Sequence, residues 1–261
     1  MTAELTSRDP KTVQVLERAL KILSFIASKR QPVSLHEIAV SIELHPSTVH
    51  RLLWNLADHG YAERDQSGCW RLGFIYLEYG HLVRDRLDVR EKALPLMQVL
   101  YEKTGETINL SMRHGDSMMY IEHVYAPQTG VRLARQVGAM APLHCTSGGK
   151  LFLAEMPPEE ISAYIARTKL QGRTENSIKT AEKLIVALSR VRELGWADDI
   201  EELEPGIQCI GAPVRDGQGQ IVAAITIISA SSMQRKPEWT RHLLSASAAV
   251  SASMGWLGTK N

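Results

Sequence analysis

Apolar positions near the start of the chain recur with the spacing of α-helices. Residues 13–28 carry Leu, Ile, Val and Ala three or four positions apart, which predicts an amphipathic first helix. Ser34 and Glu37 form an S-x-x-E capping box, which predicts a short second helix over residues 35–41. Pro46 suits the first position of a third helix, because its fixed φ is helical and its missing N–H is not needed there. The chain therefore begins with three closely spaced helices.

The third helix has two chemically different faces. The apolar face, which we expect to be buried, consists of Val49, Leu52, Leu53 and Leu56. The opposite face consists of side chains that can form hydrogen bonds: Ser47, Thr48, His50, Arg51 and Asn55. A helix divided in this way rests on a core and presents a polar surface to a partner or to water.

After Gly60, which is placed to end the third helix in a left-handed conformation, the spacing changes to that of strands. Residues 61–64 and 69–72, joined by a polar turn, predict a β-hairpin. Three helices and a hairpin make a winged helix-turn-helix, whose third helix lies in the major groove of DNA. Arg64 and Arg71 in the hairpin are then candidates for phosphate contact. The alternative is a small helical bundle whose polar face is only solvated.

The remainder of the chain mixes helical and strand-like patterns. A connecting helix is expected over residues 74–86 and another over residues 89–103, which Gly105 stops. Strands are predicted over residues 108–112, 119–123, 208–214 and 220–228, and helices over residues 147–155, 157–167, 180–194 and 237–256. Strands in hairpins with helices set between them make an α+β sheet domain.

Length and composition fit two folded domains. The chain has 261 residues, and its 44% hydrophobic content can fill cores of ordinary size. No apolar run approaches the roughly 20 residues that span a bilayer, and residues 1–11 contain no hydrophobic signal segment, so we expect a cytoplasmic protein without a membrane partner. The formal net charge of +1 gives no global sign of nucleic-acid binding, so any DNA contact must depend on local charges.

Catalysis and metal binding are the competing interpretation. Cys209 and His144 could pair as nucleophile and base, or His144 could bind zinc with the three cysteines. Cys209 lies in an apolar segment, where a buried thiol behaves as a small hydrophobe, and no GxSxG, HExxH or phosphate-loop motif occurs. We therefore expect no enzyme, cofactor or metal site. The chain has three cysteines, Cys69, Cys145 and Cys209. An odd number of cysteines without CxxC spacing also argues against a disulfide framework. A pure protein-interaction module is a third interpretation, but it would leave the helix-turn-helix unexplained.

Several motifs along nearly the whole chain resemble those of one known family. They are P-S-T-V-H-R-L-L from Pro46, W-R-L-G from Trp70, P-L-H-C-T-S-G-G-K from Pro142, G-W-A-D-D-I-E-E from Gly195 and G-I-Q-C-I-G-A-P-V from Gly206. In order and spacing these motifs resemble the IclR family of transcriptional regulators. The resemblance implies a DNA-binding winged helix-turn-helix over residues 13–73, a linker helix over residues 74–88 and a GAF-like effector-binding domain over residues 89–257.

The resemblance also indicates where an effector binds. Ser147 and Gly148 lie where a loop becomes a helix, so their backbone amides suit a carboxylate. A plain glycine-rich turn is the alternative. In the family, ligand carboxylates are held by backbone at these two positions and by the side chains that match Asp199, Cys209, Thr226 and Ile228.

Ile228 departs from the family pattern. Family members that bind small ketoacids have Ser at this position. The absence of that hydroxyl group here argues against glyoxylate or pyruvate as the effector. We expect an apolar wall formed by Ile228 and Met112, with Met119 as a further candidate, which suits the ring or chain of a larger carboxylate such as an aromatic acid. The alternative is that Met112 and Ile228 are core residues.

One recognition helix covers only a few base pairs, so sequence specificity requires a symmetric assembly. We expect a homodimer or homotetramer that binds repeated half-sites in double-stranded operator DNA. An effector changes the DNA affinity only through its differential affinity for two arrangements of that assembly. Both a repressor and an activator are compatible with this scheme.

Overall fold

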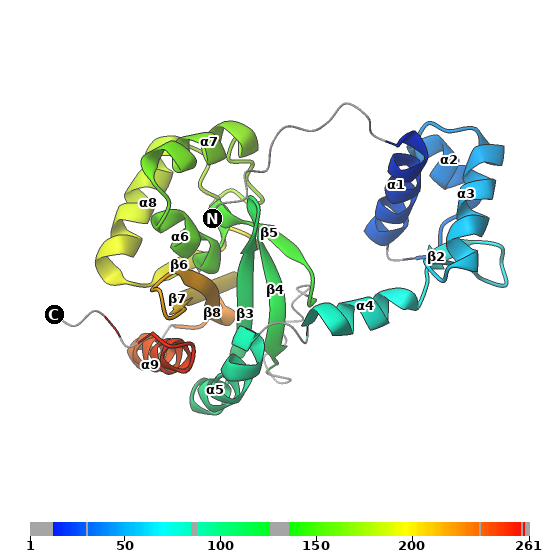
Figure 1. The fold of residues 1–261 in the computed structure, drawn as a ribbon. Helices are drawn as coiled ribbons and strands as arrows, with labels where there is room; N and C mark the ends of the chain where they lie inside the picture. The colour runs from blue at the N-terminus through cyan, green and yellow to red at the C-terminus, as the bar shows by residue number, and fades with distance from the viewer. Residues whose placement is uncertain are drawn as a thin grey trace. The chain divides into compact units, whose positions relative to one another are not determined.

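The chain divides into two compact units, residues 1–86 and residues 87–261 (Figure 1). The computed structural model describes residues 13–29, 31–84, 88–125, 136–234, 236–256 and 258. The first unit contains helices and a hairpin, and the second contains one antiparallel sheet with helices on both faces, so the predicted α+β architecture is confirmed. Residues 85–87, which the sequence places in the linker, and residues 1–11 lie outside the described residues.

The first unit is a winged helix-turn-helix. Its elements are α1 (Gln14–Ser28), α2 (Leu35–Ser41), α3 (Pro46–Asp58), β1 (Ala62–Arg64), β2 (Trp70–Leu72) and α4 (Ile75–Arg84). Both halves of the capping box form at α2: the Ser34 amide donates to Glu37 Oε2 at 2.8 Å, and the Glu37 amide donates to Ser34 Oγ at 3.2 Å. His45 is the N-cap of α3, and its side chain accepts a hydrogen bond from the Ser47 amide.

The core of the first unit uses only part of the apolar stripe on α1. Ile22 and Ile26 are buried against α3 and β2, whereas Leu16 and Leu20 are 56% and 54% exposed. The predicted amphipathic helix is present, but within the first unit the residues that α1 buries lie in its second half. Leu77, in the first turn of α4, is also 71% exposed.

The second unit is built on a six-stranded antiparallel sheet with the order β5-β4-β3-β8-β7-β6. The strands are β3 (Thr107–His114), β4 (Ser117–Val124), β5 (Met140–Pro142), β6 (Ala197–Ile200), β7 (Ile207–Arg215) and β8 (Ile221–Ala230). The helices are α5 (Asp88–Thr104), η1 (Leu143–Cys145), α6 (Ser147–Ala154), α7 (Pro158–Thr168), α8 (Ala181–Leu194) and α9 (Pro237–Ser253). The pattern does not predict β5 and β6, because strands this short show no alternation and form through pairing with a neighbour.

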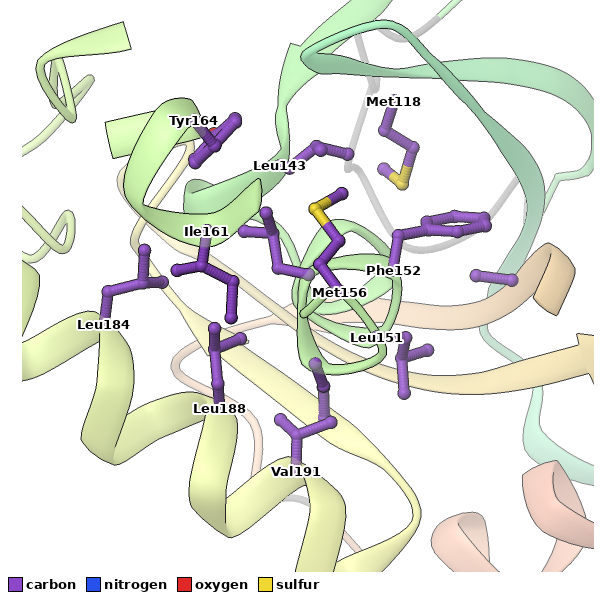
Figure 2. Packing of buried hydrophobic residues seen from close by; sticks show 14 of the residues in the cluster. Met118, Leu143, Leu151, Phe152, Met156, Ile161, Tyr164, Leu184, Leu188 and Val191 are labelled. Atoms are coloured by element: carbon purple, nitrogen blue, oxygen red, sulfur yellow. The ribbon is translucent and has the colours of Figure 1, made fainter. Parts of the chain in front are cut away.

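The central strands are buried on both faces, between two layers of helices (Figure 1). Ile108 of β3 and Ile225 of β8 pack in the core shared with α5 and α9. On the opposite face, Leu151 of α6, Leu188 of α8 and Met118 of β4 belong to one cluster of buried apolar residues (Figure 2). A strand covered on both faces is apolar throughout, which explains the continuous hydrophobic run of β8. No helix in the described part of the chain combines the length and hydropathy needed to cross a bilayer.

Candidate functional sites

The residues predicted to contact DNA are distributed along the outer surface of α3. Thr48 is half-buried, and the other four are exposed: Ser47, His50, Arg51 and Asn55. His50 Nε2 accepts a hydrogen bond from the Trp54 indole at 2.9 Å, and Asn55 Nδ2 donates to the Arg51 carbonyl at 2.8 Å. Within the described part of the chain, the Arg51 guanidinium makes no hydrogen bond or ion pair, so it is free to meet a phosphate or a base edge.

The two arginines of the wing are held by local contacts. Arg64 Nε donates to the Gly68 carbonyl at 3.1 Å and so closes the turn between the strands. Arg71 forms an ion pair with Glu63 across the hairpin at 3.0 Å. Exposed pairs of this kind contribute about 0–1 kcal/mol, so Arg71 can exchange Glu63 for a phosphate at small cost.

The four side chains that the resemblance assigned to the effector form a contiguous patch on the α6 face of the sheet. Asp199, Cys209 and Ile228 occupy directly paired positions on β6, β7 and β8, and Thr226 lies two residues before Ile228. Thr226 pairs with Gly211 of β7. Directly paired residues of antiparallel strands project from the same face. All four side chains are buried.

The N-terminal end of α6 lies directly on this patch. A Cβ atom at Gly211 would lie 3.2 Å from Ser147 Oγ and 3.3 Å from the Gly148 amide nitrogen. A Cβ atom at Gly148 would lie 2.6 Å from Met118 Sδ and 3.2 Å from the Ser111 hydroxyl oxygen. Glycine at both positions therefore allows the helix end and the strands to approach closely.

Two backbone amides at the start of α6 have no acceptor among the described residues. Thr146, the N-cap, accepts from the Gly149 amide through its side chain at 3.1 Å, and the Lys150 amide donates to the Thr146 carbonyl at 2.9 Å. The amides that remain are those of Ser147 and Gly148. Free N–H groups at the positive end of a helix are suited to bind a carboxylate.

Met112 lies on the other face of the sheet, so its predicted place beside Ile228 is wrong. It pairs with Met119 of β4, and both side chains pack against the core shared with α5 and α9. Successive residues of a strand alternate between faces, and Met112 is in phase with Leu110 of that core. Ile228 instead packs in a small apolar cluster that includes Ile207.

The hydrophobic pattern does not single out two residues of the α6 face. Ile207 joins the cluster of Ile228, and Asn109 of β3 pairs with Thr226. The sequence does contain a signal for Asn109, since polar residues occupy the alternate positions 107, 109 and 111. This alternation marks a polar strip on one face of β3.

A buried ion pair lies beside the patch. Lys150 Nζ lies 2.6 Å from Glu202 Oε1, and both side chains are largely buried. The Glu202 amide donates to Asp199 Oδ1 at 2.9 Å. Burial raises the pKa of Glu202 to about 7, against the opposing effect of the Lys150 charge. The pair ties α6 to the segment that positions Asp199.

His144, the residue considered as a catalytic base, is engaged in hydrogen bonds of the fold. His144 Nε2 donates to the Gln171 carbonyl at 3.2 Å, so its Nδ1 accepts from the Tyr164 hydroxyl at 2.6 Å. Burial lowers the pKa of His144 and raises that of the Cys145 thiol to about 11, which keeps both groups neutral. Among the described residues, no cluster of three or more His, Cys, Asp or Glu is arranged to hold a metal ion.

A winged helix-turn-helix and a separate α+β unit together define a transcriptional regulator with a DNA-binding and a ligand-binding domain. Residues 15–66 match the model of the IclR helix-turn-helix domain, and residues 81–252 match that of the bacterial transcriptional regulator IclR C-terminal domain. The chain belongs to the IclR family.

Known relatives span nearly the whole chain. The HTH-type transcriptional regulator KipR of Bacillus subtilis is 33% identical over 227 residues, which cover 86% of this chain and 90% of KipR. The regulator XynR of Escherichia coli is 30% identical over 248 residues, which cover 94% of this chain and 98% of XynR. In fold, the chain is similar to an IclR homolog from Microbacterium hydrocarbonoxydans complexed with 4-hydroxybenzoate, with a TM-score of 0.81, 22% identity, and coverage of 92% and 98% of the two chains.

Glu202 should give the free energy of unfolding a specific dependence on pH. Its ordinary pKa is 4.5 and its pKa in the fold is about 7. Between these values the folded state keeps a proton that the unfolded state releases, so the stability present below pH 4.5 is lost as pH rises to about 7. In Glu202→Gln this component should disappear, whatever the change in absolute stability.

Urea unfolding at closely spaced pH values measures this component. Glu159→Gln, which alters an exposed residue on α7, is the matched control and should keep the wild-type dependence. Identical pH profiles for wild type and Glu202→Gln would contradict the role assigned to the buried carboxyl group.

Proposed function

We propose that the protein is a ligand-responsive DNA-binding regulator whose effector is a small organic carboxylate, larger or more apolar than glyoxylate or pyruvate. The observation that carries this proposal is the start of α6, where the free amides of Ser147 and Gly148 face the buried patch of Cys209, Thr226 and Ile228. A buried anion needs such donors, because water is not available to solvate it.

The apolar part of the proposed effector follows from the lining of the patch. Ile228, Ile207 and Cys209 form one buried cluster on this face. Where a hydroxyl group would bind the keto oxygen of a small acid, Ile228 offers only a hydrocarbon surface. Such a surface favours the ring or chain of a larger acid. The homolog of similar fold from Microbacterium hydrocarbonoxydans was crystallised with 4-hydroxybenzoate, which makes this acid a suitable probe.

A hydrolase that uses Cys209 and His144 is the second candidate. The engagement of both His144 ring nitrogens with Tyr164 and Gln171 argues against it, because the imidazole is then not available as a base. The relatives KipR and XynR are named as transcriptional regulators. We therefore propose a binding protein that acts in the cytoplasm, where its operator DNA is.

We propose that the functional unit is a homodimer or a dimer of dimers. In the first unit Leu16 and Leu20 of α1 lie on one exposed apolar stripe, and Phe74 and Leu77 at the start of α4 form another exposed apolar surface. Exposed apolar residues that cluster in this way mark an interaction surface. A second copy of the chain would bury these apolar residues and would also supply the second recognition helix that repeated half-sites require.

Effector binding changes DNA affinity in this scheme through the assembly. The effector must bind one arrangement of the dimer more tightly than another, and the ratio of the two affinities limits the change in DNA affinity. A typical coupling of about 1–3 kcal/mol corresponds to a change of roughly 5- to 150-fold.

Arg51→Ala should weaken DNA binding without unfolding the protein, because the Arg51 side chain is exposed on α3 and has no partner within the described residues. If Arg51 contacts a phosphate, the slope of log K against log salt should fall by about one; if it contacts a base, about 1–3 kcal/mol should be lost at one base pair. Fluorescence anisotropy with operator DNA at several salt concentrations distinguishes the two. Arg173→Ala, at an exposed arginine of the second unit, serves as the control. Unchanged affinity and sequence preference would remove Arg51 from the interface.

Glutamate at Leu16 and Leu77 should shift the protein toward the monomer, because a charge in an apolar interface must lose its hydration. We expect analytical ultracentrifugation to show a lower mass for the Leu16→Glu, Leu77→Glu double variant than for wild type at equal concentration. Val40→Glu, which alters a 63% exposed valine on α2, is the matched control and should keep the wild-type mass. Equal masses for the double variant and wild type would place the interface elsewhere.

Ile228→Ser should improve the affinity for pyruvate and glyoxylate and weaken that for larger acids. A new hydroxyl donor to a charged ligand is worth about 1.5–3 kcal/mol, and the lost contact with the Ile side chain costs roughly 1.5–3 kcal/mol. Titration calorimetry with pyruvate, glyoxylate, an aliphatic diacid and a hydroxybenzoate measures both effects, and Cys209→Ala checks the location of the site. A wild-type protein that binds glyoxylate tightly and ignores every larger acid would refute the assigned role of Ile228.

A further inference from the structure

Asn109 carries a buried polar group that the fold itself does not use. The residue is 1% exposed, and its Nδ2 atom has no hydrogen-bond partner among the residues that the structure describes. Its neighbours in the sheet differ, since Thr107 and His123 each make an interaction of their own. A buried donor left without an acceptor costs stability, so such a group in a folded protein indicates a missing partner.

The strand pairing fixes the direction of the Asn109 side chain. Asn109 pairs directly with Thr226 of β8, which pairs with Gly211 of β7, so the three residues form one row on the α6 face. Its neighbours along β3, Ile108 and Leu110, belong to the core on the opposite face. The carboxamide therefore projects into the same patch as Thr226.

Asn109 lies at some distance from the amides that suit a carboxylate. The start of α6 contacts Gly211, two strands away from Asn109 in the row, and Ser111, two residues away along β3. With strands about 4.8 Å apart and about 3.4 Å per residue along a strand, these separations are roughly 10 Å and 7 Å. An acid whose second polar group is next to its carboxylate, as in pyruvate, does not span this distance. A ring or a short chain between the two groups does.

We propose that Asn109 is a specificity-determining residue that hydrogen-bonds a second polar group of the effector, a hydroxyl or carbonyl separated from the carboxylate by a ring or a short chain. This inference rests on the proposed function, because it takes the carboxylate to be bound by the Ser147 and Gly148 amides. A carboxamide both donates and accepts, so it satisfies a hydroxyl group in either direction. Thr226 lies between the two ends of the effector, and Ile228 contacts its apolar part.

The test compares acids that differ by one hydroxyl group, using the full-length protein and titration calorimetry. The pairs are benzoate with 4-hydroxybenzoate, and hexanoate with 6-hydroxyhexanoate. We expect wild type to bind the hydroxylated member of at least one pair about tenfold more tightly, the effect of one well-made hydrogen bond. In Asn109→Leu this preference should fall to within about twofold, because the apolar side chain has a similar size but no polar group. Ser229→Ala, which removes a buried hydroxyl from the opposite face of β8, should keep the preference.

A second measurement separates a binding role from a structural one. If the Asn109 side-chain amide forms its hydrogen bond only with a ligand, the ligand-free Asn109→Leu protein should melt at the wild-type temperature or above it, because a buried unpaired donor has been removed. A lower melting temperature, or failure to fold, would show that the amide supports the fold and would overturn the proposal. So would an equal preference in wild type and Asn109→Leu, or no preference in wild type. If wild type binds none of the four acids, the proposed carboxylate effector fails as well, which distinguishes the two failures.

Discussion

The close approach of α6 to the sheet at Gly148 and Gly211 is the contact on which the proposed effector site depends. A helix that packs on a sheet is normally held away from it by side chains of both layers. Here neither glycine has a side chain, so the first amides of the helix face strand residues directly. Thr146 caps only the Gly149 amide, which leaves two donors over a buried surface. The same contact therefore closes the core and exposes the two donors that we propose to bind the carboxylate of the effector.

The Lys150–Glu202 pair holds this arrangement from the side. Burial raises the pKa of Glu202 although Lys150 is in direct contact, so desolvation outweighs the attraction between the charges. The pair is accordingly better understood as a positioning device than as a source of stability. Because the Glu202 amide also binds the Asp199 carboxylate, the pair fixes the edge of the sheet relative to the start of α6.

Local signals in the sequence were sufficient for the first unit and insufficient for the faces of the sheet. The capping box at Ser34, the proline at the start of α3 and Gly60 after it act within a few residues, so each can be recognised without knowledge of the rest of the fold. The error at Met112 has the opposite origin. β8 is apolar in both phases, so its sequence does not reveal which residues lie under α6, and only the pairing of β3 with β8 decides it. The exposure of Leu16 and Leu20 on α1 likewise depends on which elements pack against the helix, and the spacing of apolar residues in the sequence does not reveal this.

The alternation of the central strands has a consequence for how such proteins diverge. On β3, β7 and β8, the residues that face α6 occupy every second position, and the residues between them belong to the core shared with α5 and α9. A substitution at Asn109 or Ile228 therefore changes the chemistry under α6 and leaves the adjacent core residues in place. With the effector bound under α6 as we propose, duplicated genes that encode this fold acquire new chemical signals by single-codon changes at alternate positions, without first rebuilding the scaffold that folds around them.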